Sequence, residues 1–449
     1  MFGRGNGRST RRPVTVAAVL LISLTAAACT ASGDTASPGA SAVPGATATP
    51  AASATPTPVA TPTATAPESA APSIGPLIDG QWTGLRWVSD GKPAPADQPA
   101  DASPSGPEVD SQFALFGWSK GYVGFEESTT WPADSSGTPT TAITSATSAD
   151  GLHWTAGKAI QLPADVASIG RVVEGPGGLL AVGYPMAATC GGPAIVRGLW
   201  RSQDGVEWTA VPLPFGTSSV FRIDGGGAGY IAFGVKKDGT SPAVWTSTDG
   251  THWTAQTPPV SAKTGAITDA TAFAGGFVIV GASLDGEGCG GPGSKSPAVW
   301  YSAAGSSWIR EALPGAASAS DVWMSVSRVS DTTLWALVQS TDATTQATTT
   351  ATWISRDGRT WTAFEPPVAV NSFVSNGSRG VAIVNGDKGE THFWAFEPDG
   401  TMRELQQTGA TLPSSEDQQG GWQEALGPAG IVVTDGLGSR FFVGVPTAD

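Results

Sequence analysis

The chain has 449 residues, a formal net charge of −14 and only 14% charged residues. Gly (59), Pro (35) and Trp (17) are abundant, which argues against a mainly helical protein and favours an all-β chain with many turns. The acidic balance argues against nucleic acid as a partner.

The first 28 residues have the pattern of an export signal. A stretch with Arg4, Arg8, Arg11 and Arg12 precedes an uncharged apolar run that ends in LTAAAC at residues 24–29. This ending resembles the bacterial lipobox, which implies cleavage before Cys29 and lipidation of that cysteine. The alternative is an ordinary secretory signal with an incidental cysteine, and the arginine pair leaves Sec or Tat export open. Either way, we expect the protein outside the cytoplasm, and the lipobox places it on the extracytoplasmic side of the cell membrane.

Residues 30–73 consist almost only of Ala, Thr, Ser, Pro and Gly. Such a segment cannot bury a core, so we predict a disordered tether over residues 29–75 and a single folded domain over residues 76–449. After the signal, no apolar stretch approaches the roughly 20 residues of a membrane helix. Lipid on Cys29 would therefore be the only contact with the membrane.

One short pattern recurs through the folded part: Ser, any residue, Asp-Gly, two residues, then Trp. Clear copies lie at residues 148–155, 202–209, 247–254 and 355–362, and the copy at 302–308 has lost its Asp. Degenerate copies lie at Asp79-Gly80 and Asp399-Gly400. The tryptophans lie 45 to 55 residues apart, which is the length of a four-stranded propeller blade. We predict that the following residues of these copies are structural: Asp150, Trp154, Asp204, Trp208, Asp249, Trp253, Trp308, Asp357 and Trp361.

The chemistry of the pattern is that of a fastened turn. The aspartate accepts bonds from nearby backbone amides, glycine takes a positive φ at little cost, and the tryptophan buries its ring between sheets. We therefore expect Trp208, Trp253 and Trp361 in the core. The pattern resembles the Asp-box, or bacterial neuraminidase repeat, of sialidase-like propellers, with one residue fewer between Ser and Trp than in many members. The resemblance covers about residues 78–445 and implies a β-propeller; kelch repeats are the second choice.

A glycine turn and a short apolar run precede each Asp-Gly unit, as at residues 177–183 and 275–281, and predict the first two strands of a blade. Six complete four-stranded blades follow, near residues 112–163, 166–214, 219–258, 267–314, 323–367 and 371–413. Residues 422–445 supply about three more strands and residues 78–88 one. The N-terminal strand would thus complete the last blade of a seven-bladed ring, although a miscounted unit would give six or eight blades.

Cys190 and Cys289 lie in matching loops, and each is followed by Gly-Gly-Pro. Export makes a disulfide between them the default. Two free thiols are the alternative, because blades two and four are not adjacent.

The resemblance to sialidases implies three arginines that clamp a sugar carboxylate and a tyrosine nucleophile supported by a glutamate. The chain fits poorly, because its tyrosines (122, 184, 230 and 301) fall on second or third strands and no Arg-Ile-Pro segment lies near the start. His153 and His252 occupy turn positions, and no Cys/His cluster has zinc spacing. We therefore expect a non-catalytic member with no cofactor and no metal.

A candidate anion site comes from counting back seven residues from the glycine that opens each second strand. This count places Arg171, Arg222 and Asp269 at equivalent points of three inner strands, with Arg328 close to that level in blade five. Inner strands line the channel, so these residues can converge near one mouth, on the face of the cysteine loops, and bind a carboxylate or sulfate. In the favoured alternative, Asp269 and neighbouring carboxylates neutralise the arginines in an internal network.

These features together predict a monomeric, lipid-anchored binding or scaffolding module for a glycan, an anionic small molecule or a protein. The first alternative is an extracellular glycan hydrolase of sialidase-like type. The second is a cell-envelope assembly factor.

Overall fold

The computed structural model describes residues 82–90, 108–131, 139–185, 194–284, 295–342, 344–386, 389–397, 400–413, 422–435 and 438–447. The signal, the tether, Cys29, Cys190 and Cys289 lie outside these residues, so their lipidation and pairing stay predictions. All the named secondary-structure elements in the described part of the chain are β-strands. No helix in this part is long and apolar enough to cross a membrane.

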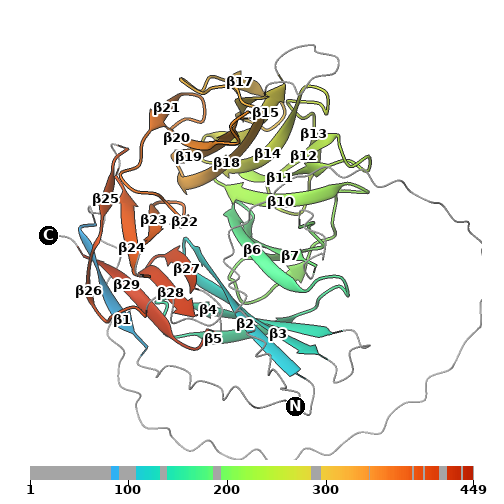
Figure 1. Ribbon diagram of the computed structural model, residues 1–449. Helices are drawn as coiled ribbons and strands as arrows, with labels where there is room; N and C mark the ends of the chain where they lie inside the picture. Colours follow the sequence, from blue (N-terminus) through green and yellow to red (C-terminus); the bar gives the residue numbers. More distant parts are fainter. Residues whose placement is uncertain are drawn as a thin grey trace, which may run out of the picture. The chain divides into compact units, whose positions relative to one another are not determined.

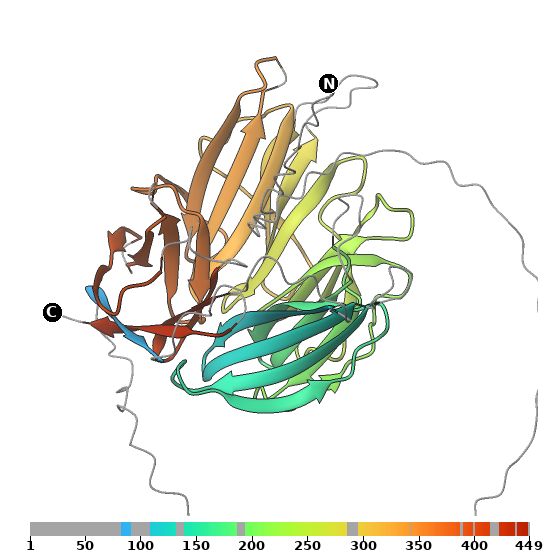
Figure 2. The ribbon, with the colours of Figure 1, turned by 60° about the horizontal axis from the view of Figure 1, so that its bottom comes forward.

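Seven sheets follow one another around a central axis in chain order and form a seven-bladed β-propeller, as predicted (Figure 1 and Figure 2). Each of the first six blades is an antiparallel sheet whose first strand is innermost. The strands of blades one to three are β2 (Glu108–Trp118), β3 (Gly121–Trp131), β4 (Thr140–Ser148) and β5 (Thr155–Ile160); β6 (Ser168–Gly175), β7 (Gly178–Tyr184), β8 (Gly198–Ser202) and β9 (Thr209–Ala210); and β10 (Ser219–Gly226), β11 (Gly229–Val235), β12 (Pro242–Ser247) and β13 (Thr254–Gln256).

Blades four to six repeat this order. Their strands are β14 (Gly265–Phe273), β15 (Gly276–Leu284), β16 (Lys295–Ser302) and β17 (Ile309–Glu311); β18 (Asp321–Ser330), β19 (Thr333–Thr341), β20 (Thr348–Ser355) and β21 (Trp361–Phe364); and β22 (Ser372–Ser375), β23 (Gly380–Asn385), β24 (Thr391–Phe396) and β25 (Met402–Glu404).

Blade seven joins the two ends of the chain. Its strand order is β26 (Gln406–Gly409), β1 (Gly84–Ser89), β29 (Phe441–Thr447), β28 (Gly430–Asp435) and β27 (Trp422–Gly427). The N-terminal strand β1 pairs antiparallel with β29, which confirms the predicted split blade. The parallel strand β26 was not predicted, and it covers the other edge of β1. Leu85 and Trp87 of β1 are buried, so both hydrogen bonding and apolar packing hold the ring closed.

The Asp-Gly turns have the predicted chemistry. In blade three, Ser247 Oγ accepts the Gly250 N–H at 2.9 Å, and Asp249 Oδ1 accepts the next two backbone N–H groups at 2.8 Å each. Gly250 has a φ of +76°, and the Trp253 indole N–H donates to the Gly250 carbonyl at 3.1 Å. The copies in blades one, two and five make the same set of bonds. Each turn is therefore a self-contained unit that satisfies its own polar groups.

These turns also fasten each blade to the preceding one. A Cβ on Gly250 would lie 2.9 Å from Leu180 of blade two, and one on Gly205 would lie 2.7 Å from Val123 of blade one. The tryptophans pack into the same interfaces, but only Trp361 is fully buried, at 2% exposure. Trp154, Trp208, Trp253 and Trp308 are half-buried. Trp208 and Trp253 therefore pack against the core clusters as expected, but each is only partly buried.

Candidate functional site

Three consecutive inner strands share an irregularity that positions charged side chains. In β6, β10 and β14 the strand register shifts directly before Arg171, Arg222 and Asp269, respectively. Each of these residues pairs with the fifth residue of its second strand, so the three positions are equivalent, as predicted. A β-bulge changes the direction in which the following side chains point, and the sequence count did not foresee it.

Arg328 occupies a different level. It pairs with Leu334, the second residue of β19, and therefore lies nearer to the end of its strand than Arg171 does. The first turns of blades two and five are equally long, so the displacement comes from the position of Arg328 in its own strand, where the register shift follows Arg328 instead of preceding it.

A cavity of about 370 Å³ lies among the inner strands of six blades. Arg171, Arg222 and Arg328 all line it, whereas Asp269 lies buried behind Arg222. Most lining residues come from the strand ends next to the turns that join the first and second strands, here called the first turns. The expected position, on the face of the cysteine loops, is therefore wrong, since those loops join the opposite ends of the strands. The other polar, charged and aromatic lining residues are Phe116, Glu174, Asp224, Ser327, Phe373, Ser375, Asn376 and Glu424.

The buried Asp269 holds Arg222 in place at the cavity wall. Its carboxylate accepts Arg222 Nη1 at 3.0 Å and the Val326 and Ala270 N–H groups at 3.1 and 2.8 Å, respectively. Its side chain is only 3% exposed, and burial raises its pKa although Arg222 and Arg171 act in the other direction. The Arg222–Asp269 pair therefore links blades three and four and also orients the guanidinium.

Asp224 of β10 lies near two arginines, Arg171 of the preceding blade and Arg222 of its own strand. Its carboxylate lies 3.3 Å from Arg171 Nη2 and 4.0 Å from Arg222 Nη2. Burial tends to raise the pKa of Asp224, but the charges of Arg171, Arg222 and Arg328 outweigh it and hold the pKa below the ordinary value. Asp224 is thus ionised at neutral pH. The carboxylates neutralise the arginines, as the network alternative expects, and yet all three guanidiniums line the open cavity.

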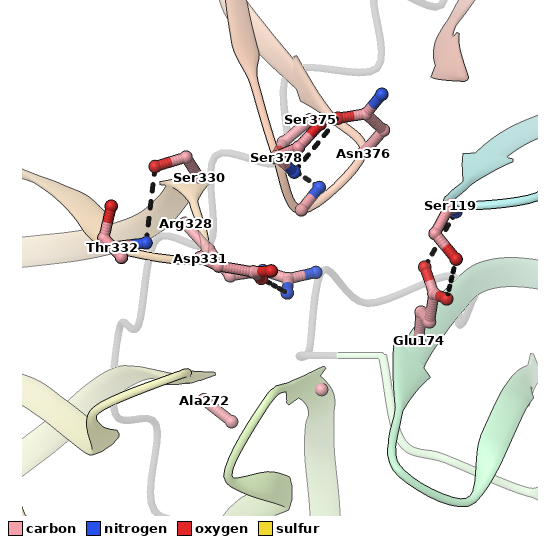
Figure 3. A network of polar contacts seen from close by, with 12 residues as sticks. Ser119, Glu174, Ala272, Arg328, Ser330, Asp331, Thr332, Ser375, Asn376 and Ser378 are labelled. Atoms are coloured by element: carbon pink, nitrogen blue, oxygen red, sulfur yellow. Dashed lines mark hydrogen bonds and ion pairs between the residues drawn. The ribbon is translucent and has the colours of Figure 1, made fainter. Parts of the chain in front are cut away.

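Hydrogen bonds between first turns link blades around the mouth of this cavity. Figure 3 shows three of the groups at the mouth: Glu174 with Ser119, Arg328 with Asp331, and Asn376 with Ser378. The bonds that link blades in this region include Ser119 N–H to Glu174, Tyr230 O–H to the Gly178 carbonyl, Ala228 N–H to Phe273, Ala274 N–H to Asp331, Asp331 N–H to Gly377, Asn376 Nδ2 to Gly427 and Tyr122 O–H to Gly430. The mouth is thus built from mutually braced turns.

Glu424 lines the cavity from β27 of blade seven. Burial raises its pKa to about 7. Among the described residues no cation pairs with it, and the hydrogen bond that opposes the rise of its pKa comes from its own backbone N–H. The sequence analysis did not single out Glu424, Asp224 or Glu174. Their place on predicted inner strands, close to the turn, was the available signal.

The positions of the tyrosines and of the acidic residues are relevant to two other functions, a tyrosine nucleophile and a metal site. The hydroxyls of Tyr122, Tyr230 and Tyr301 donate to backbone carbonyls at 2.7–2.8 Å, so all three brace turns. Tyr184 packs in the core between blades two and three. Within the described ranges, no group of three or more His, Cys, Asp or Glu residues is placed to hold a metal ion.

The chain matches no protein-family model and no curated protein. Among solved structures it is similar to the acylaminoacyl peptidase of Pyrococcus horikoshii, with 12% identity over 76% of this chain and 52% of the other, at a TM-score of 0.39. A sialidase of Trypanosoma rangeli shows 11% identity over 66% of this chain and 54% of the other, at 0.28. A GH32 β-fructofuranosidase of Bombyx mori shows 10% identity over 76% and 89%, at 0.26. Such low scores carry no argument about activity.

Proposed function

We propose that this protein is a lipid-anchored binding module, and that it takes a small anionic ligand in the axial cavity. One observation carries the proposal: guanidiniums from blades two, three and five line a single cavity of about 370 Å³. That volume suits a small molecule. Arginine also matches carboxylate and sulfate groups by two-point hydrogen bonding.

The arginines have donors left for a ligand. A guanidinium has five N–H donors. Arg171 has one ion pair, at 3.3 Å, and its side chain is 29% exposed. Arg328 has one ion pair, at 2.9 Å, to Asp331, which is itself half exposed. An incoming anion can therefore bind without the loss of the Arg222–Asp269 pair that holds the blades together.

Arg328 offers the cleaner test of this site, because its partner is solvated and no buried carboxylate is left behind when it is replaced. We expect Arg328→Gln to weaken binding of D-glucuronate or inorganic sulfate at least tenfold, which is about 1.4 kcal/mol, as measured by calorimetric titration of the full-length protein in detergent. Arg197→Gln is the matched control, since Arg197 forms a solvated pair with Asp165 outside the cavity. Equal binding by both variants and wild type would place the anion elsewhere.

The membrane anchor is a separate part of the proposal. It rests on the lipobox-like sequence that ends at Cys29. Mass spectrometry of membrane-extracted protein should find acylated Cys29 as the first residue, and Cys29→Ser should release the protein or stall its processing. A soluble, unmodified mature wild type would contradict the anchor and leave the cavity proposal intact.

A second candidate, glycoside hydrolysis, is favoured by the different environments of two carboxyl groups in the cavity. Asp224 is held ionised by the arginines, whereas burial favours the protonated form of Glu424. A pair of carboxyl groups whose pKa values are pushed apart is typical of acid and base roles. Turnover of aryl glycosides that Glu424→Gln abolishes would support this activity, and saturable binding without turnover would support the binding module.

A further inference from the structure

Glu424 stands apart from the other charged groups of the cavity. Its strand, β27, is three blades away from β10 around the ring of seven, so it faces Arg222 and Asp224 from the far side of the axis. The two neighbouring inner strands contribute only uncharged residues to the lining next to it, namely Leu115, Phe116, Gly117, Phe373, Val374 and Ser375. The cavity therefore has one side with three arginines and their paired carboxylates, and a less polar side with a single carboxyl group.

Among the side chains that the structure describes, the elements packed against β27 hold few other titratable groups. On β28, Asp435 lies 3.9 Å from Arg440. On β3, the Tyr122 hydroxyl donates to the Gly430 carbonyl, Glu126 is exposed, and Glu127 accepts the Ile169 N–H between blades one and two. The charged groups across the cavity are Arg171, Glu174, Arg222, Asp224 and Arg328. Among these described groups, none pairs with Glu424, so its protonation depends on burial and on what occupies the cavity.

The two forms of Glu424 act on a bound anion in opposite ways. A protonated carboxyl group donates one hydrogen bond, whereas an ionised one only accepts and repels negative charge. Because burial raises the pKa of Glu424 to about 7, both forms are populated near neutral pH.

We propose that Glu424 determines which anions the cavity accepts, by donating a hydrogen bond to a second, uncharged oxygen of an organic acid whose carboxylate is held by the arginines. This inference rests on the proposed function. The ligand class is a hydroxy acid or a similar acid with an acceptor oxygen away from its carboxylate. Ionisation of Glu424 removes that donor and adds a like charge, so the ligand is released as the pH rises.

The pH dependence has a definite sign. Binding that requires one protonated group with a pKa near 7 is nearly complete at pH 6 and about tenfold weaker at pH 8. Glu424→Gln keeps a donor and cannot ionise, so we expect it to bind at pH 8 about as tightly as wild type binds at pH 6. Glu126→Gln is the matched control, because Glu126 is exposed on the adjacent strand β3 and does not line the cavity.

The experiment measures the Kd of D-glucuronate and of acetate at pH 6, 7 and 8, by calorimetry on the full-length protein in detergent. Wild type and Glu126→Gln should lose about tenfold in affinity for glucuronate over this range, Glu424→Gln should lose none, and acetate should bind more weakly than glucuronate at pH 6. A cooperative melting transition in each variant establishes that it is folded. A wild-type pH profile in Glu424→Gln, with binding still sensitive to Arg328→Gln, overturns the role of Glu424 alone. Absence of wild-type binding at pH 6, or binding insensitive to Arg328→Gln, overturns the arginine site as well.

Discussion

On the rim of the propeller the same turn recurs in successive blades, whereas around the axis equivalent positions carry different residues. The Asp-Gly turns of blades one, two, three and five make the same hydrogen bonds, and their glycines pack against the preceding blade. At the axis, the position after the bulge is arginine in blades two and three and aspartate in blade four. The repeated turns make the contacts that each pair of neighbouring blades needs. The residues that differ between inner strands give the cavity two unlike sides.

The largest loss on the rim is expected at Trp361, which is fully buried, whereas Trp154, Trp208, Trp253 and Trp308 are half-buried. Trp361→Ala should lower the free energy of unfolding by about 3–5 kcal/mol, because it removes a large ring from the cluster between blades four and five. Chemical denaturation followed by circular dichroism measures this loss.

The half-buried Trp208 is the matched comparison. It packs 5.3 Å from the ring of Phe125 in blade one, but part of its ring is solvated. We expect Trp208→Ala to cost about half as much as Trp361→Ala, since the apolar area removed from water is smaller. Equal losses would mean that burial does not control the contribution of these tryptophans.

At the axis, Arg222→Met should cost about 3 kcal/mol of folding stability at pH 7.5, because it leaves the buried Asp269 carboxylate without its cation. The double variant Arg222→Met with Asp269→Asn should recover part of this loss, as measured by urea denaturation. A near-neutral single variant would show that Arg222 acts only on ligands, and that the network is not structural.

The third prediction concerns the pH dependence of stability. Glu127 is buried, accepts the Ile169 N–H at 2.6 Å, and has a pKa raised by burial to about 7 from 4.5. Between pH 4.5 and 7 the folded protein therefore binds more protons at this site than the unfolded chain, and stability falls as pH rises through this window. Glu127→Gln should remove this fall and stabilise the protein by about 2–3 kcal/mol at pH 8.

Glu424 titrates in the same direction, so a residual fall should remain in Glu127→Gln and disappear only when Glu424→Gln is added. Denaturation midpoints at pH 5 and pH 8 for the single and double variants separate the two contributions. A single variant with the full wild-type slope would show that Glu127 is not the titrating group.

The blade pattern was predictable because each blade repeats short local signals. Asp-Gly turns and glycine-opened apolar runs placed all six complete blades and the split seventh one, and the strands begin and end within a few residues of the expected positions. Strand β26 escaped prediction, since Gln406–Gly409 is polar and exposed and its strand partner, β1, comes from the other end of the chain. Such a non-local parallel pairing leaves no periodic pattern in its own four residues.

The charged site was predictable only in part. Counting from the glycine turns placed Arg171, Arg222 and Asp269 at equivalent points, and the structure brings the two arginines to one cavity. Which face the cavity occupies depends on how far each inner strand reaches and on the bulges, which the count ignores. The raised pKa of Glu424 arises from its burial in a cavity that residues of six blades line, so no local sequence pattern predicts it.

The smallest expected effect concerns the turn at residues 302–308, which lacks the Asp that the clear copies have. In blade four, Gly305 keeps a φ of +76° and its N–H still donates to Ser302 Oγ at 2.8 Å, although Ala304 stands where the other copies have Asp. In this described turn the buried Trp308 indole nitrogen has no hydrogen-bond partner, whereas the Trp253 nitrogen donates to Gly250. The serine and glycine thus suffice for the turn, and the aspartate completes its hydrogen bonding.

Ala304→Asp should therefore stabilise the protein by about 0.5–1 kcal/mol, because the new carboxylate can accept the next two backbone N–H groups. Ala303→Asp adds the same charge one position earlier, at an exposed residue outside the Asp position of the turn, and should give no gain. Urea denaturation of both variants at pH 7.5 makes the comparison. An equal gain from both would assign the effect to net charge, and a loss from Ala304→Asp would mean that blade four has repacked around its missing carboxylate.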